Sequence, residues 1–180
     1  TYNVTITDQK GCFKDTSVIV LEPDALLIAS MSMDSASCNG VADGTATANG
    51  ITGGNGINSF SWNTTPLQTT NPATGLAAGN YTITVTDQKG CFTTRDTTVL
   101  EPLLLVIDTT FQDSVSCNGL FDGTASVVAS GGNGIYSYLW SDGQTTATAS
   151  NLTAGTYNVT ITDQKGCFKD TSVIVLEPDA

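Results

Sequence analysis

Apolar and polar residues alternate along several short stretches of the chain, most clearly from Tyr157 to Thr162. The Tyr, Val and Ile residues of this stretch fall on one side of an extended strand, and its Asn and Thr residues fall on the other. The pattern predicts a half-buried antiparallel strand. Residues 163–166 are a turn sequence whose final glycine supplies a positive φ, and residues 171–175 are predicted to return as the hairpin partner.

The same alternation places strands along the rest of this region. Predicted strands cover residues 103–111, 123–130, 135–140 and 145–152, bounded by Gly, Asn, Asp or Pro. Turn signals therefore recur roughly every 8–12 residues, which amounts to about seven strands in one small domain. This density predicts an all-β fold built from immunoglobulin-like β-sandwiches.

The strand pattern recurs because the sequence itself repeats. Residues 1–25 and 156–180 are the same peptide, and a diverged copy of its first half covers residues 80–92. A Leu-Glu-Pro triplet closes each copy, with its proline at positions 23, 102 and 178. Ser-Cys-Asn-Gly followed by Asp-Gly-Thr-Ala is a second landmark, found at residues 37–46 and 116–125.

These landmarks divide the chain into three parts. Residues 1–25 are predicted to be the C-terminal strands of a preceding, truncated repeat, and residues 26–102 and 103–180 to be complete immunoglobulin-like repeats. Because the chain starts inside a repeat, we expect it to be a window on a longer array, with neighbouring repeats as its partners. Leu-Glu-Pro leads into the next repeat without a Gly/Ser linker, so we expect limited flexibility between repeats.

Composition and charge narrow the class of function. Charged residues make up only 13% of the chain, and the net charge is −11 with no His. An acidic surface repels phosphate backbones, which argues against a nucleic-acid partner. No apolar run reaches the roughly 20 residues that span a bilayer, so we expect no membrane insertion in this segment. Since catalytic and phosphate-binding motifs are also missing from the sequence, we expect neither enzymatic activity nor a cofactor.

Aromatic residues recur at fixed places in the two complete repeats. Trp62 and Trp140 fall on the third predicted strand, where sandwiches of this type bury an aromatic side chain. The motif Leu-x-Ala-Gly-x-Tyr, ending at Tyr81 and Tyr157, is typical of a tyrosine corner. We interpret all four as core residues. The alternative is a carbohydrate-binding platform in which Tyr138 lies beside Trp140 on one face.

Taken together, the landmarks resemble the SprB repeat of giant surface adhesins of gliding bacteria. The matching motifs are Cys-Asn-Gly, Asp-Gly-Thr-Ala, Gly-Gly-Asn-Gly, Tyr-x-Trp-Ser-Asp-Gly, the tyrosine-corner motif and Leu-Glu-Pro. They cover all of residues 103–180 and nearly all of 26–102, which departs at residues 60–63. The resemblance implies export by the type IX secretion system of Bacteroidota, display at the cell surface, and a role in adhesion or gliding motility.

Two functions are compatible with this family. In the first, the repeats are a structural segment of a long extracellular filament or stalk that supports surface adhesion. In the second, the repeats themselves are weak, multivalent binding modules for polysaccharide or substratum, with avidity arising from their number. Buried aromatic side chains would favour the first function and exposed ones the second.

The five cysteines occupy two places in the repeat: Cys38 and Cys117 in Ser-Cys-Asn-Gly, and Cys12, Cys91 and Cys167 in Lys-Gly-Cys-Phe. This regularity is typical of disulfides in an extracellular, oxidising setting. We predict the intra-repeat pairs Cys38–Cys91 and Cys117–Cys167, with the partner of Cys12 lying upstream. The alternative is Cys38–Cys167. The two cysteines of one sandwich fall near opposite poles, which could place them too far apart, because a disulfide needs Cα atoms within about 7 Å. Head-to-tail stacking would instead bring Cys38 near Cys167 of the next repeat.

Two further kinds of site are weaker candidates. Asp43, Asp122 and Asp142 stand in Asp-Gly turns and are possible Ca²⁺ ligands, although turn chemistry alone explains Asp-Gly. Several Asp-Ser/Thr motifs are similar to the O-glycosylation signal of the same bacterial group. The candidate acceptors are Thr16, Ser35, Thr97, Thr109, Ser114 and Thr171.

Overall fold

The computed structural model describes residues 1–179, which form fourteen β-strands and no helix. No segment of this part of the chain is a helix long and apolar enough to cross a membrane. The strands are β1 (Tyr2–Thr7), β2 (Phe13–Val18), β3 (Leu27–Asp34), β4 (Gly44–Thr52), β5 (Ser59–Trp62), β6 (Ala73–Leu76), β7 (Gly79–Thr86), β8 (Phe92–Val99), β9 (Leu103–Asp113), β10 (Gly123–Gly132), β11 (Ser137–Trp140), β12 (Thr148–Leu152), β13 (Gly155–Thr162) and β14 (Phe168–Val175).

Strands β3 to β8 form the first sandwich and strands β9 to β14 the second. In the first, one sheet has the order β3-β4-β6 and the other β5-β7-β8, and the second repeats this as β9-β10-β12 and β11-β13-β14. This is the A-B-E and C-F-G order of an immunoglobulin domain that lacks strand D. The all-β, immunoglobulin-like prediction is therefore confirmed, with six strands in each sandwich where about seven were expected.

The hairpin that closes the second sandwich forms as predicted, although its return strand begins at Phe168 and not at residue 171. Tyr157 pairs with Val173 across β13 and β14, in continuous antiparallel register. Val159 and Ile161 are buried, whereas the alternate positions of β13 are half-buried or exposed. Gly166 has φ 87°, which supplies the positive φ of the connecting turn. Alternation and turn chemistry together account for this element.

Residues 1–25 have the same sequence as this closing hairpin but a different environment. They form the β1–β2 hairpin, every residue of which is exposed. Val4 is 46% exposed, whereas the equivalent Val159 is 1% exposed. The hairpin is thus encoded locally, whereas burial of its apolar face requires the remaining strands of a sandwich.

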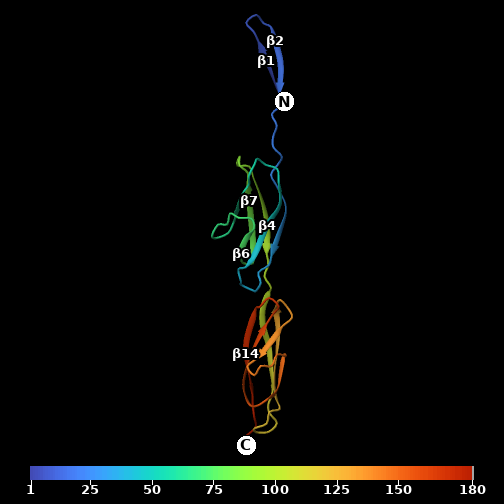
Figure 1. Ribbon diagram of the computed structural model, residues 1–180, viewed down its shortest axis with the longest axis vertical. Coiled ribbons are helices and arrows are strands. Elements are labelled where there is room, and N and C mark those ends of the chain that lie inside the picture. The colour runs from blue at the N-terminus through green and yellow to red at the C-terminus, as the bar shows by residue number, and fades with distance from the viewer. Residues whose placement is uncertain (180) are drawn as a thin grey trace.

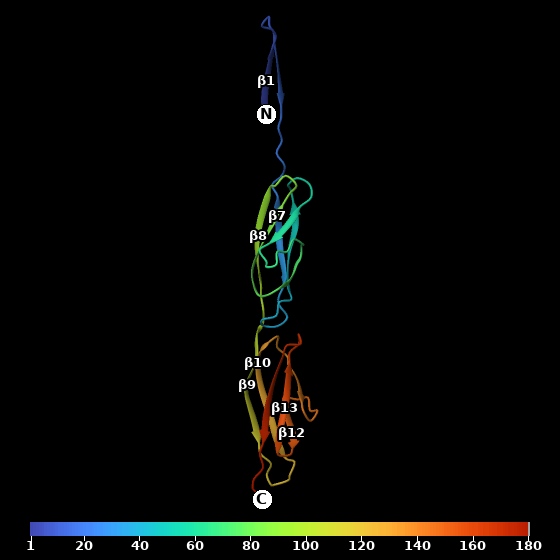
Figure 2. The ribbon, with the colours of Figure 1, turned by 90° about the vertical axis from the view of Figure 1, so that its left-hand side faces the viewer.

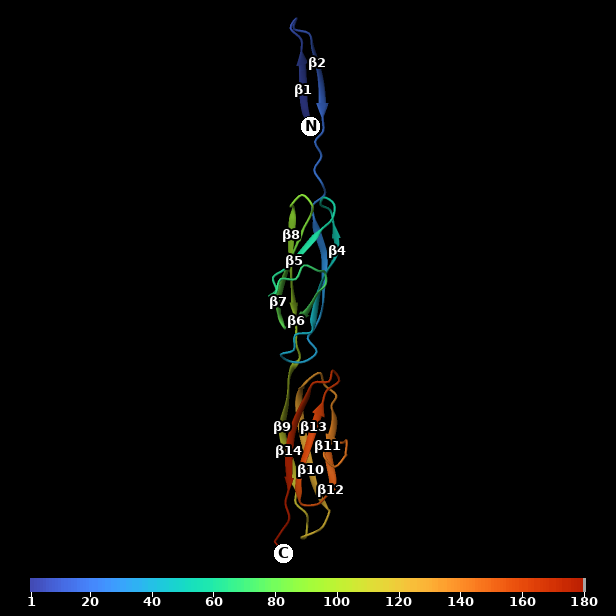
Figure 3. The same cartoon turned by 60° about the vertical axis from the view of Figure 1, so that its left-hand side comes forward.

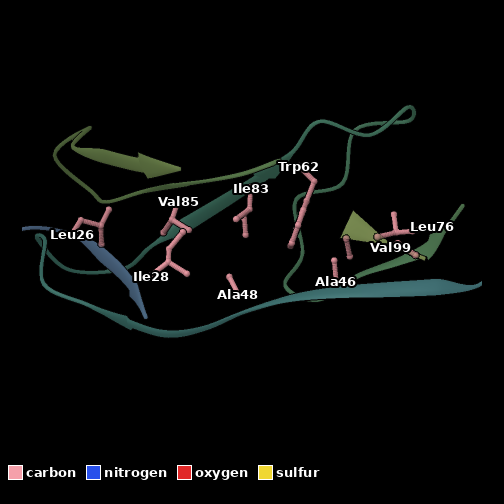
Figure 4. Close-up of a cluster of buried hydrophobic side chains, with 10 residues drawn as sticks. Leu26, Ile28, Ala46, Ala48, Trp62, Leu76, Ile83, Val85 and Val99 are labelled. Atoms are coloured by element: carbon pink, nitrogen blue, oxygen red, sulfur yellow. The ribbon is translucent and has the colours of Figure 1, made fainter. Parts of the chain in front are cut away.

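Each sandwich has its own apolar core, and Figure 4 shows that of the first. Trp62 and Trp140 are 0% and 1% exposed at the centres of the two cores. Each indole Nε1–H donates to a backbone carbonyl, that of Thr70 at 2.9 Å and that of Thr146 at 2.8 Å. Both tryptophans are therefore core residues with a satisfied polar group, as predicted.

Both tyrosine corners are also present. The hydroxyl of Tyr81 donates to the carbonyl of Ala77 at 2.9 Å, and that of Tyr157 donates to the carbonyl of Thr153 at 3.1 Å. Each bond fixes the chain where it enters the strand that follows the Leu-x-Ala-Gly motif.

The two sandwiches follow one another along a single long axis, with the β1–β2 hairpin at the N-terminal end (Figures 1 and 2). Strand β8 leaves the first sandwich and leads into β9 of the second through Leu100–Pro102 (Figure 3). The β7–β8 turn therefore lies at the N-terminal pole of the first sandwich, and the loop after β3 lies at its C-terminal pole. The β13–β14 turn of the second sandwich faces that loop across the junction.

Candidate functional site

A disulfide joins the two sandwiches. Cys38, in the loop after β3, bonds to Cys167, in the β13–β14 turn, with their Cα atoms 5.7 Å apart. The two residues are 129 positions apart in sequence. The bond is therefore a covalent link across the junction.

The predicted intra-repeat pairs Cys38–Cys91 and Cys117–Cys167 are wrong in this structure. The loop that holds Cys38 lies at the C-terminal pole of the first sandwich, where the Asn39 side-chain amide donates to the carbonyl of Pro102 at 3.1 Å. Cys91 lies in the β7–β8 turn at the other pole. Stacking thus decides the pairing, as the alternative had it, and Cys12, Cys91 and Cys117 are free and exposed.

The turn that presents Cys167 is organised by a buried carboxylate. Asp163 is 5% exposed, and its Oδ1 accepts the backbone N–H groups of Lys165 at 2.8 Å and Cys167 at 3.0 Å. Its Oδ2 accepts both the backbone N–H and the side-chain amide of Asn133, at 2.7 and 2.9 Å. Four donors to one carboxylate hold the turn in a single conformation.

Asn133 extends this arrangement across the junction. Its side-chain Nδ2 also donates to the backbone carbonyl of Ser37, at 2.9 Å. Ser37 directly precedes Cys38, so the hydrogen bond and the disulfide meet the same loop. We call the five residues Ser37, Cys38, Asn133, Asp163 and Cys167 the junction clasp.

Hydrogen bonding sets the ionisation of the clasp carboxylate. Burial acts most strongly on Asp163 and opposes its ionisation, but the bonds from Asn133 and the turn N–H groups together outweigh burial and hold its pKa below the ordinary value. In the first sandwich the same arrangement surrounds Asp87. There the Asn55 side chain contributes most, and the pKa of Asp87 falls from 3.8 to about 2. Both carboxylates are charged at neutral pH.

A glycine makes room for the clasp carboxylate. A Cβ atom on Gly132 would lie 2.6 Å from Asp163 Oδ2, and the φ of this residue is 58°. Only glycine meets both requirements without displacing the carboxylate. This explains why Gly-Gly-Asn-Gly recurs as one landmark in the sequence.

The Cys38 loop is likewise held in place from its own sandwich. Gly40 N–H donates to the Glu101 carboxylate at 2.6 Å, and Ala36 N–H donates to the carbonyl of Leu100 at 2.8 Å. The Leu-Glu-Pro triplet therefore fixes the loop that carries the cysteine, in addition to joining the two units.

The candidate Ca²⁺ residues serve their own loops. Asp43 Oδ1 accepts the backbone N–H of Ser37 at 2.8 Å, and Asp122 accepts the N–H and hydroxyl of Ser116. Bonds from these serines, the side-chain bond foremost, lower the pKa of both aspartates. Asp142 accepts the side-chain amide of Gln144 at 2.7 Å. Residues 1–179 contain no group of three or more His, Cys, Asp or Glu side chains placed to hold a metal ion.

A carbohydrate-binding platform, the alternative interpretation of these aromatic residues, is not formed. Trp140 is buried in the core, and Tyr136 and Tyr138 are half-buried against the same cluster. The Tyr136 hydroxyl donates to the carbonyl of Gly131 at 2.8 Å, which ties this ring to the base of the Gly-Gly-Asn-Gly loop. These aromatic side chains therefore support the sandwich and its polar loop.

The candidate glycosylation residues differ in accessibility. Four are exposed and two are half-buried. The exposed residues are Thr16, Ser35, Thr109 and Ser114, and the half-buried residues are Thr97 and Thr171. Their modification stays a prediction.

Sequence reasoning overlooked Asn133 and Asp163. Both belong to landmarks that recur in the two complete repeats, Gly-Gly-Asn-Gly and Asp-Gln-Lys-Gly-Cys. The turns themselves need glycine but not a particular Asn–Asp pair. Recurrence of the two polar residues together is therefore the signal in the sequence that they have a further role. What the sequence lacks is the information that the two loops meet at one pole and face a neighbouring sandwich.

Comparison with solved structures returns immunoglobulin-domain proteins at low similarity. The amphioxus IgVJ-C2 molecule is 14% identical with a TM-score of 0.32, over 81% of this chain and 96% of that one. The N-terminal eight immunoglobulin domains of Down syndrome cell adhesion molecule are 12% identical with a TM-score of 0.31, over 93% of this chain and 26% of that one. The fold assignment therefore rests on the strand order given above.

Comparison at the level of sequence is more specific. No curated protein matches the chain. The profile of the SprB repeat matches residues 109–145, which run from β9 through β10 and β11 to the turn after Trp140. The segment thus contains the Ser-Cys-Asn-Gly, Asp-Gly-Thr-Ala and Gly-Gly-Asn-Gly landmarks. This match confirms the resemblance of the chain to the SprB repeat family.

Proposed function

We propose that this chain is a structural, non-catalytic segment of a long adhesin filament or stalk at the bacterial cell surface, where it supports adhesion and gliding motility. The observation that carries the proposal is the junction clasp. A disulfide and a hydrogen bond join the Cys38 loop of one sandwich to the β13–β14 turn of the next. A chain of such junctions projects whatever lies at its tip to a distance that grows with the number of units.

The surface of the sandwiches fits a spacer. The tryptophans lie in the cores, and the polar positions are mostly Thr, Ser, Asn and Asp. A net charge of −11 keeps neighbouring filaments apart and soluble. An oxidising extracellular location fits the presence of a disulfide.

Small-angle X-ray scattering on the full chain tests the stalk. We expect one extended particle whose maximum dimension agrees with the rod of Figure 1, and a Cys38→Ser variant that samples bent conformations. A chain that is already bent when oxidised would contradict the proposal. So would saturable binding of the chain to a surface polysaccharide, because the units would then act as binding modules.

A further inference from the structure

We propose that Cys91 and Cys117, the exposed thiols of the two complete units, form disulfides with neighbouring units in the same way as Cys38 and Cys167. Cys117 forms a disulfide with the Lys-Gly-Cys cysteine of a unit stacked on the C-terminal pole of the second sandwich. Cys91 forms a disulfide with the Ser-Cys-Asn-Gly cysteine of a unit stacked on the N-terminal pole of the first sandwich. The partner is another repeat of the same kind, so the inference rests on the proposed array.

The C-terminal pole of the second sandwich already has the geometry of the Cys38 loop. Asn118 donates from its side chain to the carbonyl of Pro178, and Gly119 N–H donates to the carboxylate of Glu177. These are the bonds that Asn39 and Gly40 make to Pro102 and Glu101 in the first sandwich. Asp122 closes the loop from the other side through Ser116. Cys117 is therefore held like Cys38, but it is exposed and free.

The N-terminal pole of the first sandwich has the geometry of the Cys167 turn. Asp87 accepts the N–H groups of Lys89 and Cys91 on one oxygen, at 2.8 and 2.9 Å, and both donors of Asn55 on the other. Within residues 1–179, the Asn55 side-chain amide donates only to Asp87, whereas Asn133 also reaches Ser37. Asn55 thus keeps a donor for the carbonyl of a neighbouring loop.

The presence of a neighbouring unit at a pole decides whether the cysteine there is bonded, since equivalent cysteines differ in state. Cys38 and Cys117 share one place, and Cys12, Cys91 and Cys167 share the other. The one disulfide within residues 1–179 joins these two places across the junction between the sandwiches and not within a unit. The same rule leaves Cys91 and Cys117 for neighbouring units, because each unit presents its two cysteines at opposite poles.

Formation of each bond is a two-electron oxidation. The two thiols lose two protons and two electrons as the S–S bond forms, and a disulfide-containing oxidant accepts them and is reduced to two thiols. Both halves of the clasp are held by bonds from their own unit, so little further ordering accompanies the reaction.

This pairing gives an array two parallel covalent paths, each made of short chain segments linked by disulfides. From Cys91 to Cys117 the chain runs 26 residues through β8, the junction and β9, and Cys12 to Cys38 has the same spacing. In a fully bonded array, tension passes along such a segment, crosses a disulfide and enters the equivalent segment two units further on. The rest of each sandwich lies outside this path.

An extended chain tests the pairing. Residues 103–180 are appended directly after Pro178, so that Leu103 again follows a Leu-Glu-Pro triplet. The appended copy carries Cys117→Ser, and Lys169→Arg gives its Cys167 peptide a different mass from that of the original part. The original part carries Cys12→Ser, because residues 11–14 would otherwise yield a second copy of the tryptic peptide 166–169. After refolding with oxidised glutathione, non-reducing tryptic mapping identifies each bond by mass.

We expect the peptide with Cys117 to be linked to the appended, Arg-terminated peptide, and the peptide with Cys38 to be linked to the original, Lys-terminated one. Cys91 then stays as the free thiol. A matched chain with Cys117→Ser in the original part should lose only the first link. A free Cys117, or one linked to Cys167 of its own unit, overturns the inference. If Cys117 is free while the Cys38–Cys167 link persists, this inference fails and the proposed stalk is unaffected.

Discussion

The side-chain amide of Asn133 donates a hydrogen bond to the backbone carbonyl of Ser37, a residue 96 positions earlier in another sandwich. The same nitrogen donates to Asp163, which organises the turn that carries Cys167. One asparagine thus connects the disulfide turn of the second unit to the disulfide loop of the first. The junction is held by polar groups that are already ordered, with the disulfide beside them.

Asn133→Ala is predicted to open the junction. The substitution removes the bonds to Ser37 and Asp163, and hydrogen bonds to charged groups contribute about 1.5–3 kcal/mol each. Because Cys38 and Cys167 are both half-buried, easier opening exposes the disulfide. We expect reduction by a dithiol to accelerate about fivefold or more, measured by alkylation of the released thiols.

Asn55→Ala is the matched control, because Asn55 holds Asp87 in the same way but has no neighbour across a junction in this chain. It should destabilise the first sandwich to a similar extent and leave the rate of Cys38–Cys167 reduction unchanged. Equal acceleration by both variants would show that the bond to Ser37 does not hold the junction.

Trp140→Ala is predicted to destabilise the second sandwich by about 3–5 kcal/mol, since it removes the largest buried side chain of that core. Urea unfolding followed by far-UV circular dichroism measures the change. In the unsubstituted chain, iodide should quench neither tryptophan before unfolding. A loss of stability below about 1 kcal/mol, or quenching of the folded chain, would favour the carbohydrate platform instead.

Local sequence predicts much of this fold for a physical reason. Alternation and an Asp-Gln-Lys-Gly turn suffice to specify a hairpin, and β1–β2 and β13–β14 form the same hairpin from the same sequence in different surroundings. Trp62, Trp140 and the tyrosine corners were equally predictable, because one side chain and its own strand define each of them.

The disulfide was not predictable in this way. Its pairing depends on which poles of two sandwiches meet, and neither strand periodicity nor cysteine spacing contains that information. The positions of Cys38 and Cys91 near opposite poles of one sandwich do argue against an intra-repeat bond. Intra-repeat pairing assumes that one unit is a complete domain, whereas the Cys38 loop is bonded to the next unit.

Acid is predicted to weaken the first sandwich through Asp87. Its folded-state pKa of about 2 lies below the value of roughly 3.9 expected in the unfolded chain. The carboxylate therefore stabilises the fold above about pH 4, and this contribution is lost as the pH falls toward 2. Urea midpoints at pH 5 and pH 2.5 should differ less in Asp87→Asn than in the unsubstituted chain.

Asp170→Asn is the control for that experiment, because it removes one carboxylate from an exposed position on β14. It should keep the full acid dependence. If Asp87→Asn and Asp170→Asn respond alike, general charge repulsion and not the Asn55–Asp87 arrangement sets the acid sensitivity.

Pulling on the two ends of the chain is predicted to bypass most of both sandwiches. Tension reaches Cys38, crosses to Cys167 and leaves through β14, so residues 39–166 carry no load while the bond is intact. Reduction should release roughly 460 Å of additional contour length, at about 3.6 Å per residue. Optical-trap extension with peptide-tag handles measures this, and Cys38→Ser should release the same length without reductant. Full extension of the oxidised chain would refute the bypass.

Non-reducing tryptic mapping of the 180-residue chain tests the central claim, that a disulfide joins neighbouring units. Cys12→Ser is included because residues 11–14 and 166–169 have the same sequence. We predict that the peptide 15–89, which contains Cys38, is linked to the peptide 166–169, which contains Cys167. A link from 15–89 to the peptide 90–95, which contains Cys91, would contradict the account, because each unit would then close on itself.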